Sequence, residues 1–370
     1  MLLRKILVIK LRALGDTVLM TASLAQLRNS YPNADIHAAV LSTWAPILEN
    51  HPAVDRVWTY ERHEETAARA KAVARLALRL RREKYDAVIG LHSSPSSALM
   101  AFGTGARIRA IHFHGHEDKN LYSTVSIPGK GVVKPAIERD MDTVRAIGIT
   151  VGPGAMPNLY VTESESQEAE RIFRTLRLKG PILGLGIGAS RPTKSWPLEK
   201  FAEAAITWCQ KTKGSVLAIV GPGEEAQALE LLHQVDQMLL RTVSDIEEVE
   251  SVRARIKFQH RLSVRQLAAT LSRLAVFLGN DSGPKHVAIA VGTPTVTLFG
   301  PEDPFEWHPY PRNQHPYFYR EGLSCRKDAD PGMPPWCGLD ECVIEKHRCM
   351  TTLEVDPVIE KCQEIARLKT

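Results

Sequence analysis

The 370-residue chain lacks any long apolar run, so no membrane-spanning helix is expected. No stretch approaches the roughly 18 consecutive apolar residues that a membrane-spanning helix needs. The N-terminal segment MLLRKILVIKLRALGD carries charges inside its apolar run and has no small-residue cleavage site, so it predicts a first strand rather than a signal peptide. The sequence therefore predicts a cytoplasmic protein.

Cysteine and excess charge are also scarce. Six cysteines in a chain of this length do not indicate a disulfide scaffold. The net charge of +5 is compatible with an acidic partner but does not require one. The basic residues are not interleaved with aromatic ones, so we expect no nucleic-acid partner.

The sequence does contain two successive series of strand and helix patterns. Apolar runs with strand character alternate with helical stretches and lie at residues 5–11, 35–41, 54–60, 85–91, 106–113, 181–189, 215–221, 275–280 and 294–300. Strands that alternate with helices predict parallel sheets with right-handed crossovers. The length of the chain favours two domains.

A Gly- and Pro-rich segment at residues 148–160 is the expected linker between the domains. We therefore predict a Rossmann-like domain over residues 1–160 and a second one over residues 161–352. Residues 353–370 are predicted to form a helix, which by analogy with this fold class would pack back on the first domain. The natural architecture is two Rossmann-like halves that face a cleft.

The most informative stretch is AVFLGNDSGPKHVAIAVGTPTVTLFGPEDP, residues 275–304, which predicts a strand, a turn, a helix and a second strand. Asp281 or Ser282 can cap the helix, and Pro284 fits its first turn. A helix N-terminus at the carboxyl end of a parallel strand suits an anionic ligand, because free backbone N–H groups point at it. On pattern alone, an ordinary turn in which Asp281 only caps the helix is an equally good interpretation.

The same stretch resembles the donor-binding motif of glycosyltransferase family 9, the heptosyltransferases of lipopolysaccharide core synthesis. The shared pattern is Asp-x-Gly-x-x-His followed by Leu-Phe-Gly-Pro-x-Asp-Pro. The resemblance implies the GT-B fold, with donor and acceptor held in the cleft between two Rossmann-like domains. The donor contacts that it implies in this stretch are Asp281, Ser282, Gly283, Lys285 and His286.

A second motif, Lys10-x-x-x-x-Gly15-Asp16, follows the first expected strand. Gly15 allows a tight turn and Asp16 can cap the next helix, and spacing alone favours this capping role. Family members carry a lysine and a Gly-Asp pair at this spacing. The resemblance therefore implies that Asp16 is the general base that deprotonates the acceptor hydroxyl.

Basic residues of the first domain are candidates for contact with an acidic acceptor. These are Lys10, Arg12 and, on the fifth expected strand, Arg107. The expected helix at residues 66–84 is also rich in arginine and lysine. A solvated face is its plainer interpretation, and attraction to anionic lipid headgroups or to a phosphorylated lipid acceptor is the alternative.

A third motif begins with Gly184-x-Gly186-x-Gly188, whose spacing is not that of the dinucleotide fingerprint G-x-G-x-x-G. A nicotinamide oxidoreductase is therefore not expected. The following ASRPTKSWP brings hydroxyls and two cations before an expected helix, which fits either a diphosphate or a solvated loop. In the family, the lysine of a Lys-x-Trp-Pro-like segment contacts the donor phosphate. The predicted donor contacts here are Gly188, Ser190, Thr193 and Lys194.

Two further features remain open. Relatives carry a ribose-binding carboxylate in the loop after the next strand, where this chain has Glu224 and Glu225, and we take Glu225 as the candidate. Four cysteines lie near the C-terminus with spacings that match no standard zinc pattern. Free thiols, a metal site and disulfides all remain compatible with Cys325, Cys337, Cys342 and Cys349, and free thiols are favoured.

Together the motifs predict an inverting glycosyltransferase that moves a heptose from ADP-heptose to a lipopolysaccharide inner-core acceptor. Lys194 and the backbone of residues 282–285 would stabilise the leaving diphosphate. No cofactor or metal is expected, because no Asp-x-Asp pair suits a metal beside the diphosphate. The acceptor implies peripheral contact with the cytoplasmic face of the inner membrane. A sugar-nucleotide epimerase and a non-catalytic nucleotide-sugar binder are the alternatives.

Overall fold

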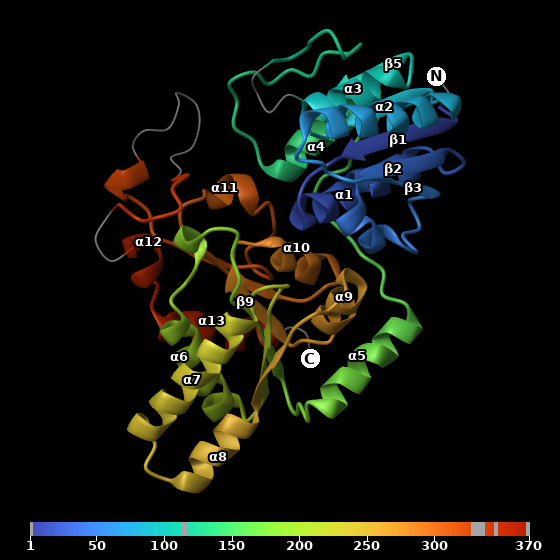
Figure 1. The fold of residues 1–370 in the computed structure, drawn as a ribbon. Coiled ribbons are helices and arrows are strands. Elements are labelled where there is room, and N and C mark those ends of the chain that lie inside the picture. Colours follow the sequence, from blue (N-terminus) through green and yellow to red (C-terminus); the bar gives the residue numbers. More distant parts are fainter. Residues whose placement is uncertain (1–2, 93, 113–116, 327–336, 344–346, 368–370) are drawn as a thin grey trace. The chain divides into compact units, whose positions relative to one another are not determined.

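The computed structural model describes residues 3–92, 94–112, 117–326, 337–343 and 347–367 (Figure 1). The chain divides into two compact units. The first contains the described residues up to Tyr160 together with Phe305–Pro309, and the second contains nearly all the others. Each unit has its own sheet and its own helices.

The first unit is built on a parallel sheet that, in the described residues, has five strands in the order β3-β2-β1-β4-β5. The central strands read as continuous apolar runs because helices cover both faces of such a sheet. The strands are β1 (Lys5–Lys10), β2 (Asp35–Leu41), β3 (Arg56–Tyr60), β4 (Ala87–Gly90) and β5 (Ile108–Ile111).

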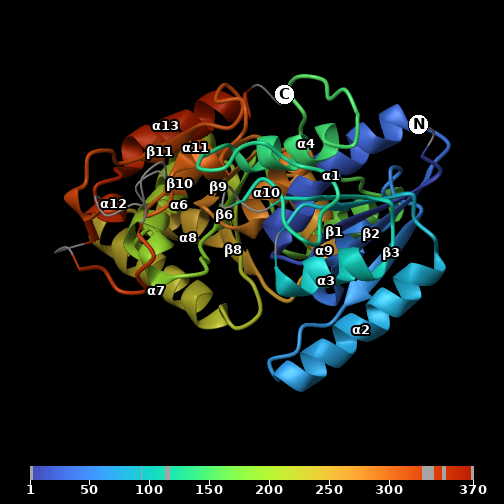
Figure 2. The same ribbon diagram turned by 90° about the horizontal axis from the view of Figure 1, so that it is seen from above.

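Helices flank this sheet, and two pairs of them pack together, α1 with α4 and α2 with α3 (Figure 2). Helix α2 buries the stripe Val73, Leu76 and Leu80 in the core beside Trp58 of β3. The helices are α1 (Leu14–Ser30), α2 (Thr66–Arg82), α3 (Pro95–Gly103) and α4 (Ala136–Arg145), with a 3₁₀ helix η1 at Ser42–Leu48.

The second unit has a parallel sheet of six described strands in the order β11-β10-β9-β6-β7-β8. Gly184 and Gly186 lie within β6, and a Cβ on Gly186 would stand 2.4 Å from the ring of Phe277 in β9. These glycines therefore make room for core packing. The strands are β6 (Ile182–Gly186), β7 (Ser215–Ile219), β8 (Ile256–Gln259), β9 (Val276–Asn280), β10 (Thr295–Phe299) and β11 (Tyr317–Tyr319).

The C-terminal helix α13 belongs to the second unit. The sequence had predicted that it would pack on the first domain. The contacts found for α13 instead join it to α6, β9 and β10 of its own unit, where Val358, Ile359 and Cys362 are fully buried. These apolar residues have the helical spacing of one buried face. The helices are α5 (Glu163–Thr175), α6 (Leu198–Thr212), α7 (Glu225–Thr242), α8 (Ile246–Ala254), α9 (Val264–Ser272), α10 (Gly283–Ala290), α12 (Arg348–Thr351) and α13 (Val355–Ala366), with 3₁₀ turns η2 (Pro192–Lys194) and η3 (Ser324–Arg326).

One short helix, α11 (Pro304–Trp307), follows the second unit's strand β10 but carries residues that group with the first unit. It brings Glu306 and Trp307 to that unit. Among the described helices, none is both long and apolar enough to cross a membrane.

Candidate functional site

Each sheet has a point where its strand order reverses, and ligands of parallel α/β sheets bind at the carboxyl ends of the strands there. In the first unit this point lies between β1 and β4, and in the second between β6 and β9. Two of the three sequence motifs follow β1 and β6, and the third begins with β9. The chain therefore places its candidate residues at both of these edges.

A small open pocket lies at the β1–β4 edge of the first unit. It brings together three predicted residues that follow or end β1, which are Lys10, Arg12 and Asp16. Its full lining is Lys10, Arg12, Asp16, Leu91, His92, His112, Ala136, Arg139, Asp140 and Trp307. Most of these side chains are polar or charged, so the pocket offers hydrogen-bond donors and acceptors to a hydrophilic ligand.

Asp16 lies in the first turn of α1, but it does not cap this helix. The helix begins at Leu14 with Ala13 at the N-cap position, and no side chain makes the capping hydrogen bond. The carboxylate of Asp16 is 3.7 Å from Nε of Arg12, and its side chain keeps 18% of its exposure. The capping interpretation is therefore wrong, and the carboxylate lines the pocket.

Lys10 is held differently from the prediction. Its ammonium is 2.6 Å from the carboxylate of Asp140, and both side chains are only 4% exposed. Asp142, two residues further on α4, binds Lys134 at 2.6 Å and Arg145 at 2.8 Å. Lys10 therefore forms an ion pair within the protein. Both carboxylates of the Asp140-x-Asp142 pair are likewise paired with side-chain cations.

Two histidines, His92 and His112, follow strands β4 and β5 and line the same pocket, and His92 was not predicted. Burial lowers the pKa of His92 to about 4, and the nearby Arg12 adds to this effect. Burial likewise lowers the pKa of His112 to about 4, with Arg139 as the next cause. Both imidazoles are therefore neutral at pH 7, a form that can donate one hydrogen bond and accept another.

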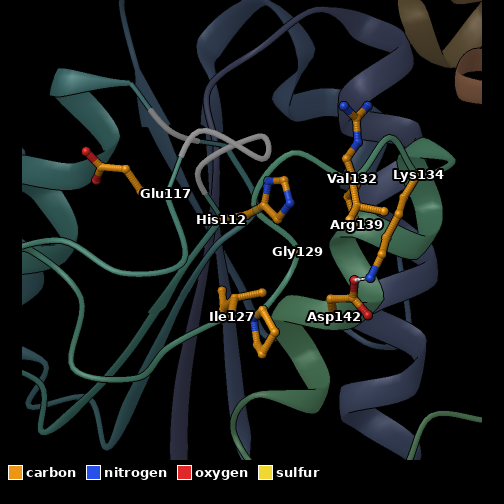
Figure 3. A pocket seen from close by; sticks show the side chains of 9 residues that line it. His112, Glu117, Ile127, Gly129, Val132, Lys134, Arg139 and Asp142 are labelled. Carbon is orange, nitrogen blue, oxygen red and sulfur yellow. Dashed lines mark hydrogen bonds and ion pairs between the residues drawn. The ribbon is translucent and has the colours of Figure 1, made fainter. Parts of the chain in front are cut away.

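A distant part of the chain completes the pocket wall. Arg139 of α4 binds the carboxylate of Glu306 at 2.7 Å, and its guanidinium lies 5.3 Å from the ring centre of Trp307. A neighbouring pocket shares His112 and Arg139 with the first (Figure 3). Figure 3 shows Lys134 beside Asp142, with which it forms an ion pair. Sequence spacing could not have placed Glu306 or Trp307 here.

Arg107, predicted to contact the acceptor, is not part of this site. It is exposed and directly precedes β5, so it lies at the amino edge of the sheet. The pocket lies at the carboxyl edge, and parallel strands keep the two edges apart. The expected strand ran two residues too far at each end, which obscured this distinction.

The edge between β6 and β9 in the second unit is organised by Asn280. Its side-chain amide donates to the backbone oxygen of Ile187 at 2.9 Å and accepts from the backbone N–H of Trp196 at 2.9 Å. Asn280 is fully buried at the end of β9. It therefore joins the glycine-rich loop after β6 to the segment that carries Lys194.

Charged side chains cluster beside these loops. Asp281 is 2.6 Å from the ammonium of Lys285 and 3.3 Å from that of Lys194. Glu302 lies 3.3 Å from Lys194 and 2.5 Å from Arg191. Burial opposes ionisation of Asp281, but Lys285 and Lys194 outweigh it and hold the pKa of this carboxyl well below its usual range. Three cations face two carboxylates, which leaves a net positive site.

Helix α10 starts at this cluster. Ser282 occupies its N-cap position without a side-chain capping bond, and Asp281 is engaged with Lys285, so neither caps the helix as expected. The first backbone N–H groups of a helix have no intrahelical acceptor and attract anions. His286 lies in the first turn and its Nδ1 is 2.5 Å from the hydroxyl of Tyr310. The site thus combines cations with Gly283 and the N-terminus of α10.

The carboxylate nearest to the glycine-rich loop is Glu224, not the predicted Glu225. A Cβ on Gly188 would stand 2.3 Å from Oε1 of Glu224, so a larger residue here would displace this carboxylate. Glu224 also accepts from the backbone N–H of Gly221 at 2.7 Å. Glu225 is instead near His260, at 3.4 Å. Two adjacent acids at a helix start could not be told apart by sequence, because only their backbone geometry separates them.

Thr193 was predicted to contact the donor, but its groups are used within the protein. Its hydroxyl donates to the backbone oxygen of Leu339 at 2.7 Å, and its own backbone oxygen accepts from His347 at 2.6 Å. Ser190 is exposed on the loop before it. The segment around Leu339 and His347 therefore supports the loop that holds Lys194.

The four C-terminal cysteines lie in or near this supporting segment. In the described part of the chain, no group of His, Cys, Asp or Glu side chains could hold a metal ion. Within the described residues, no disulfide joins Cys325, Cys337, Cys342 or Cys349, and Cys349 is buried while Cys342 is exposed.

Comparison with known proteins gives consistent results. Residues 73–331 match the model of glycosyltransferase family 9 (heptosyltransferase). The chain is 26% identical over 310 residues to lipopolysaccharide heptosyltransferase 3 of Escherichia coli K12, covering 81% of this chain and 83% of that protein. It is 20% identical over 366 residues to the lipopolysaccharide core heptosyltransferase OpsX of Haemophilus influenzae, covering 98% and 97%.

Solved structures share the fold. A family 9 glycosyltransferase from Veillonella parvula superposes with a TM-score of 0.79 at 20% identity, covering 99% of this chain and 98% of that one. ADP-heptose lps heptosyltransferase II of E. coli gives a TM-score of 0.72 at 20% identity, with 99% of each chain covered. The predicted α/β GT-B class is confirmed.

Proposed function

The chain belongs to glycosyltransferase family 9, and on this premise we propose that it moves a heptose from ADP-heptose to the inner core of lipopolysaccharide. The predicted family and enzyme class are confirmed. The donor and acceptor are carried over from relatives, which include lipopolysaccharide heptosyltransferases and a heptosyltransferase solved with ADP-2-deoxy-2-fluoro heptose.

In the proposed reaction, Asp16 is the general base. Its carboxylate takes the proton of an acceptor hydroxyl while the oxygen attacks the anomeric carbon. The bond from that carbon to the diphosphate breaks, and ADP leaves with the bonding electrons. A single displacement of this kind inverts the anomeric centre. The supporting observation is that Asp16 caps nothing and lines the pocket at the β1–β4 edge.

The leaving diphosphate is assigned to the second unit. Lys194 and the backbone N–H groups at the start of α10 would stabilise its developing charge. The carboxylate of Glu224 is the candidate for the ribose hydroxyls, since it lies against Gly188. Residues 161–352 would then form the donor domain, and residues 1–160 the acceptor domain.

Protein groups would neutralise the charge of the leaving diphosphate, so the proposed reaction needs no divalent metal. Cations and a helix N-terminus already face the expected diphosphate position, and each can offset its negative charge. Added chelator should therefore leave the rate of heptosyl transfer unchanged. A strict dependence on Mg²⁺ would contradict this part of the proposal.

Acceptor recognition is assigned to the pocket around Asp16. Neutral His92 and His112 can exchange hydrogen bonds with sugar hydroxyls, and the ring of Trp307 offers an apolar face to a sugar. Lys10 would act by positioning, since its ammonium binds Asp140. An acceptor carried by lipid would make the protein peripheral at the cytoplasmic face of the inner membrane.

The direct test is ADP release from ADP-heptose with and without heptose-deficient lipopolysaccharide. We expect release that depends on the acceptor. Release at the same rate without acceptor would indicate hydrolysis. Conversion of the nucleotide sugar without any release would indicate an epimerase. Tight ADP binding without turnover on any acceptor of an inner-core panel would indicate a binding protein.

A further inference from the structure

Helix α2 of the first unit carries charge of one sign. Over Thr66–Arg82 it has six basic residues and no acidic one, whereas α5 over Glu163–Thr175 mixes both signs. A helix face that only meets water usually carries both signs, because pairs of opposite charge stabilise it. A cluster of basic residues on the exposed face of a helix is instead typical of a surface that meets anionic lipid.

The exposed residues of α2 form one stripe opposite its buried side. Val73, Leu76 and Leu80 face the core of the first unit. On the other side, four residues recur at i, i+4, i+7 and i+11, the spacing that aligns side chains along one helix face. This set, the α2 stripe, consists of Lys71, Arg75, Leu78 and Arg82. Leu78 is 63% exposed between the cations.

The cations of the stripe are uncompensated. Within the described residues, Lys71, Arg75 and Arg82 form no ion pair with a carboxylate, and all three are exposed. Arg79, which lies beside the stripe, differs because its guanidinium stacks 4.9 Å from the ring centre of Trp58. The stripe therefore presents three free positive charges around one apolar side chain.

We propose that the α2 stripe docks the protein on an anionic phospholipid surface. Its cations attract lipid headgroups, and Leu78 enters the interface. Helix α3 lies beside α2 (Figure 2) and exposes Leu99 and Phe102 at 45% and 47%. Apolar side chains therefore reach solvent on both helices. This inference extends the proposed function, whose acceptor is lipid-borne, but docking is measured without sugar transfer and the two fail separately.

The test is sedimentation of the protein with vesicles of phosphatidylglycerol and phosphatidylethanolamine, compared with phosphatidylcholine vesicles. The triple variant Lys71→Gln, Arg75→Gln, Arg82→Gln should bind the anionic vesicles roughly 100-fold more weakly, since each cation near such a surface contributes about fivefold. A matched variant removes three exposed cations from the second unit, with the substitutions Arg171→Gln, Arg174→Gln and Arg241→Gln. It should bind within about threefold of the native chain.

Three further readouts complete the test. Salt at about 1 M should abolish binding, because the screening length falls to about 3 Å. Leu78→Ser should weaken binding, whereas Leu240→Ser, at an equally exposed site of α7, should not. Both triple variants should keep native transfer to a water-soluble acceptor fragment. Equal binding to both vesicle types, equal loss in both triple variants, or no vesicle binding by the native chain would each overturn the proposal.

Discussion

At the scale of single residues, Asp16 and Glu224 show how position decides chemistry. Both are acids at the start of a helix, where a carboxylate is favoured by the helix dipole whatever else it does. Asp16 makes no capping bond and lines a pocket, and Glu224 lies against a glycine that leaves room for it. These environments, rather than residue type, make them functional candidates.

The pair Glu224 and Glu225 offers a matched test of donor binding. Glu224→Gln should raise the KM for ADP-heptose about tenfold or more, since hydrogen bonds to a charged group contribute roughly 1.5–3 kcal/mol. Glu225→Gln should change it less than twofold, because Glu225 lies near His260. The measurement is initial-rate kinetics at varied donor concentration. A larger rise in the KM for ADP-heptose in Glu225→Gln than in Glu224→Gln would show that Glu225, as predicted from sequence, is the ribose-binding carboxylate.

A second residue-scale prediction concerns the buried charges behind the donor loops. Lys285→Met removes the 2.6 Å partner of Asp281 and leaves a buried carboxylate with only the more distant Lys194. We expect a loss of about 3 kcal/mol in the free energy of unfolding, read from the urea midpoint. The control Lys361→Met breaks an exposed pair with Glu364 and should cost less than about 0.5 kcal/mol. An equal loss of unfolding free energy in the two variants would mean that the buried pair stabilises the fold no more than the exposed pair does.

At the scale of elements, the carboxylate of Glu165 joins helix α5 to α9. Glu165 accepts from Nε and Nη2 of Arg265 at 2.7 and 2.6 Å and from the backbone N–H of Thr162, the N-cap residue. These bonds, led by that from Arg265, lower the pKa of Glu165 to about 2. The Glu165 side chain therefore stabilises the N-terminus of α5 and also joins this helix to α9.

This arrangement predicts a pH dependence of stability. The folded pKa of Glu165 lies below its unfolded value of about 4.5, so its contribution is present above pH 4.5 and is lost as pH falls towards 2. Glu165→Gln should flatten the fall in the urea midpoint between about pH 5 and pH 3. Glu168→Gln, whose carboxylate accepts from the neutral side chain of Gln266, is the control. An unchanged pH profile in Glu165→Gln would refute the assignment.

Elements differ in how far sequence could predict them. The buried strands β1, β2, β7 and β9 were located to within two residues, because long apolar runs have few other places in a globular fold. Strands β8 and β11, of four and three residues, were missed because so short a run carries no periodicity. Helix α4 supplies Arg139 and Asp140 to the pocket and was also missed, since its role depends on packing against α1.

At the scale of the whole molecule, two units with separate sheets predict separate responses to ligand. Under the proposed function, ADP binds the loops after β6 and β9. Hydrogen exchange should slow in residues 187–196 and 281–288 when ADP is added, because binding raises the cost of local opening. The pocket residues of the first unit, around Asp16, should show little direct protection from the nucleotide. Protection confined to the first unit would contradict the division of roles.

The family motifs could be recognised from sequence, but the site could not be completed from them. Trp307 follows Asp16 by almost the whole chain, and its segment groups with the first unit only through tertiary contacts. Arg107 was misassigned because composition does not reveal which edge of a sheet a residue occupies. Lys10 was located correctly, but its partner Asp140 lies on a distant helix.

The central claim is that Asp16 removes the proton from the acceptor, and one measurement tests it directly. It is acceptor-dependent ADP release from ADP-heptose by the native chain and by Asp16→Asn, which keeps the size of the side chain. We predict a fall in kcat of roughly 10²–10⁴-fold with donor affinity unchanged, the range typical of a lost general base. A variant that turns over within tenfold of the native rate would contradict the account and move the base to another residue of the pocket.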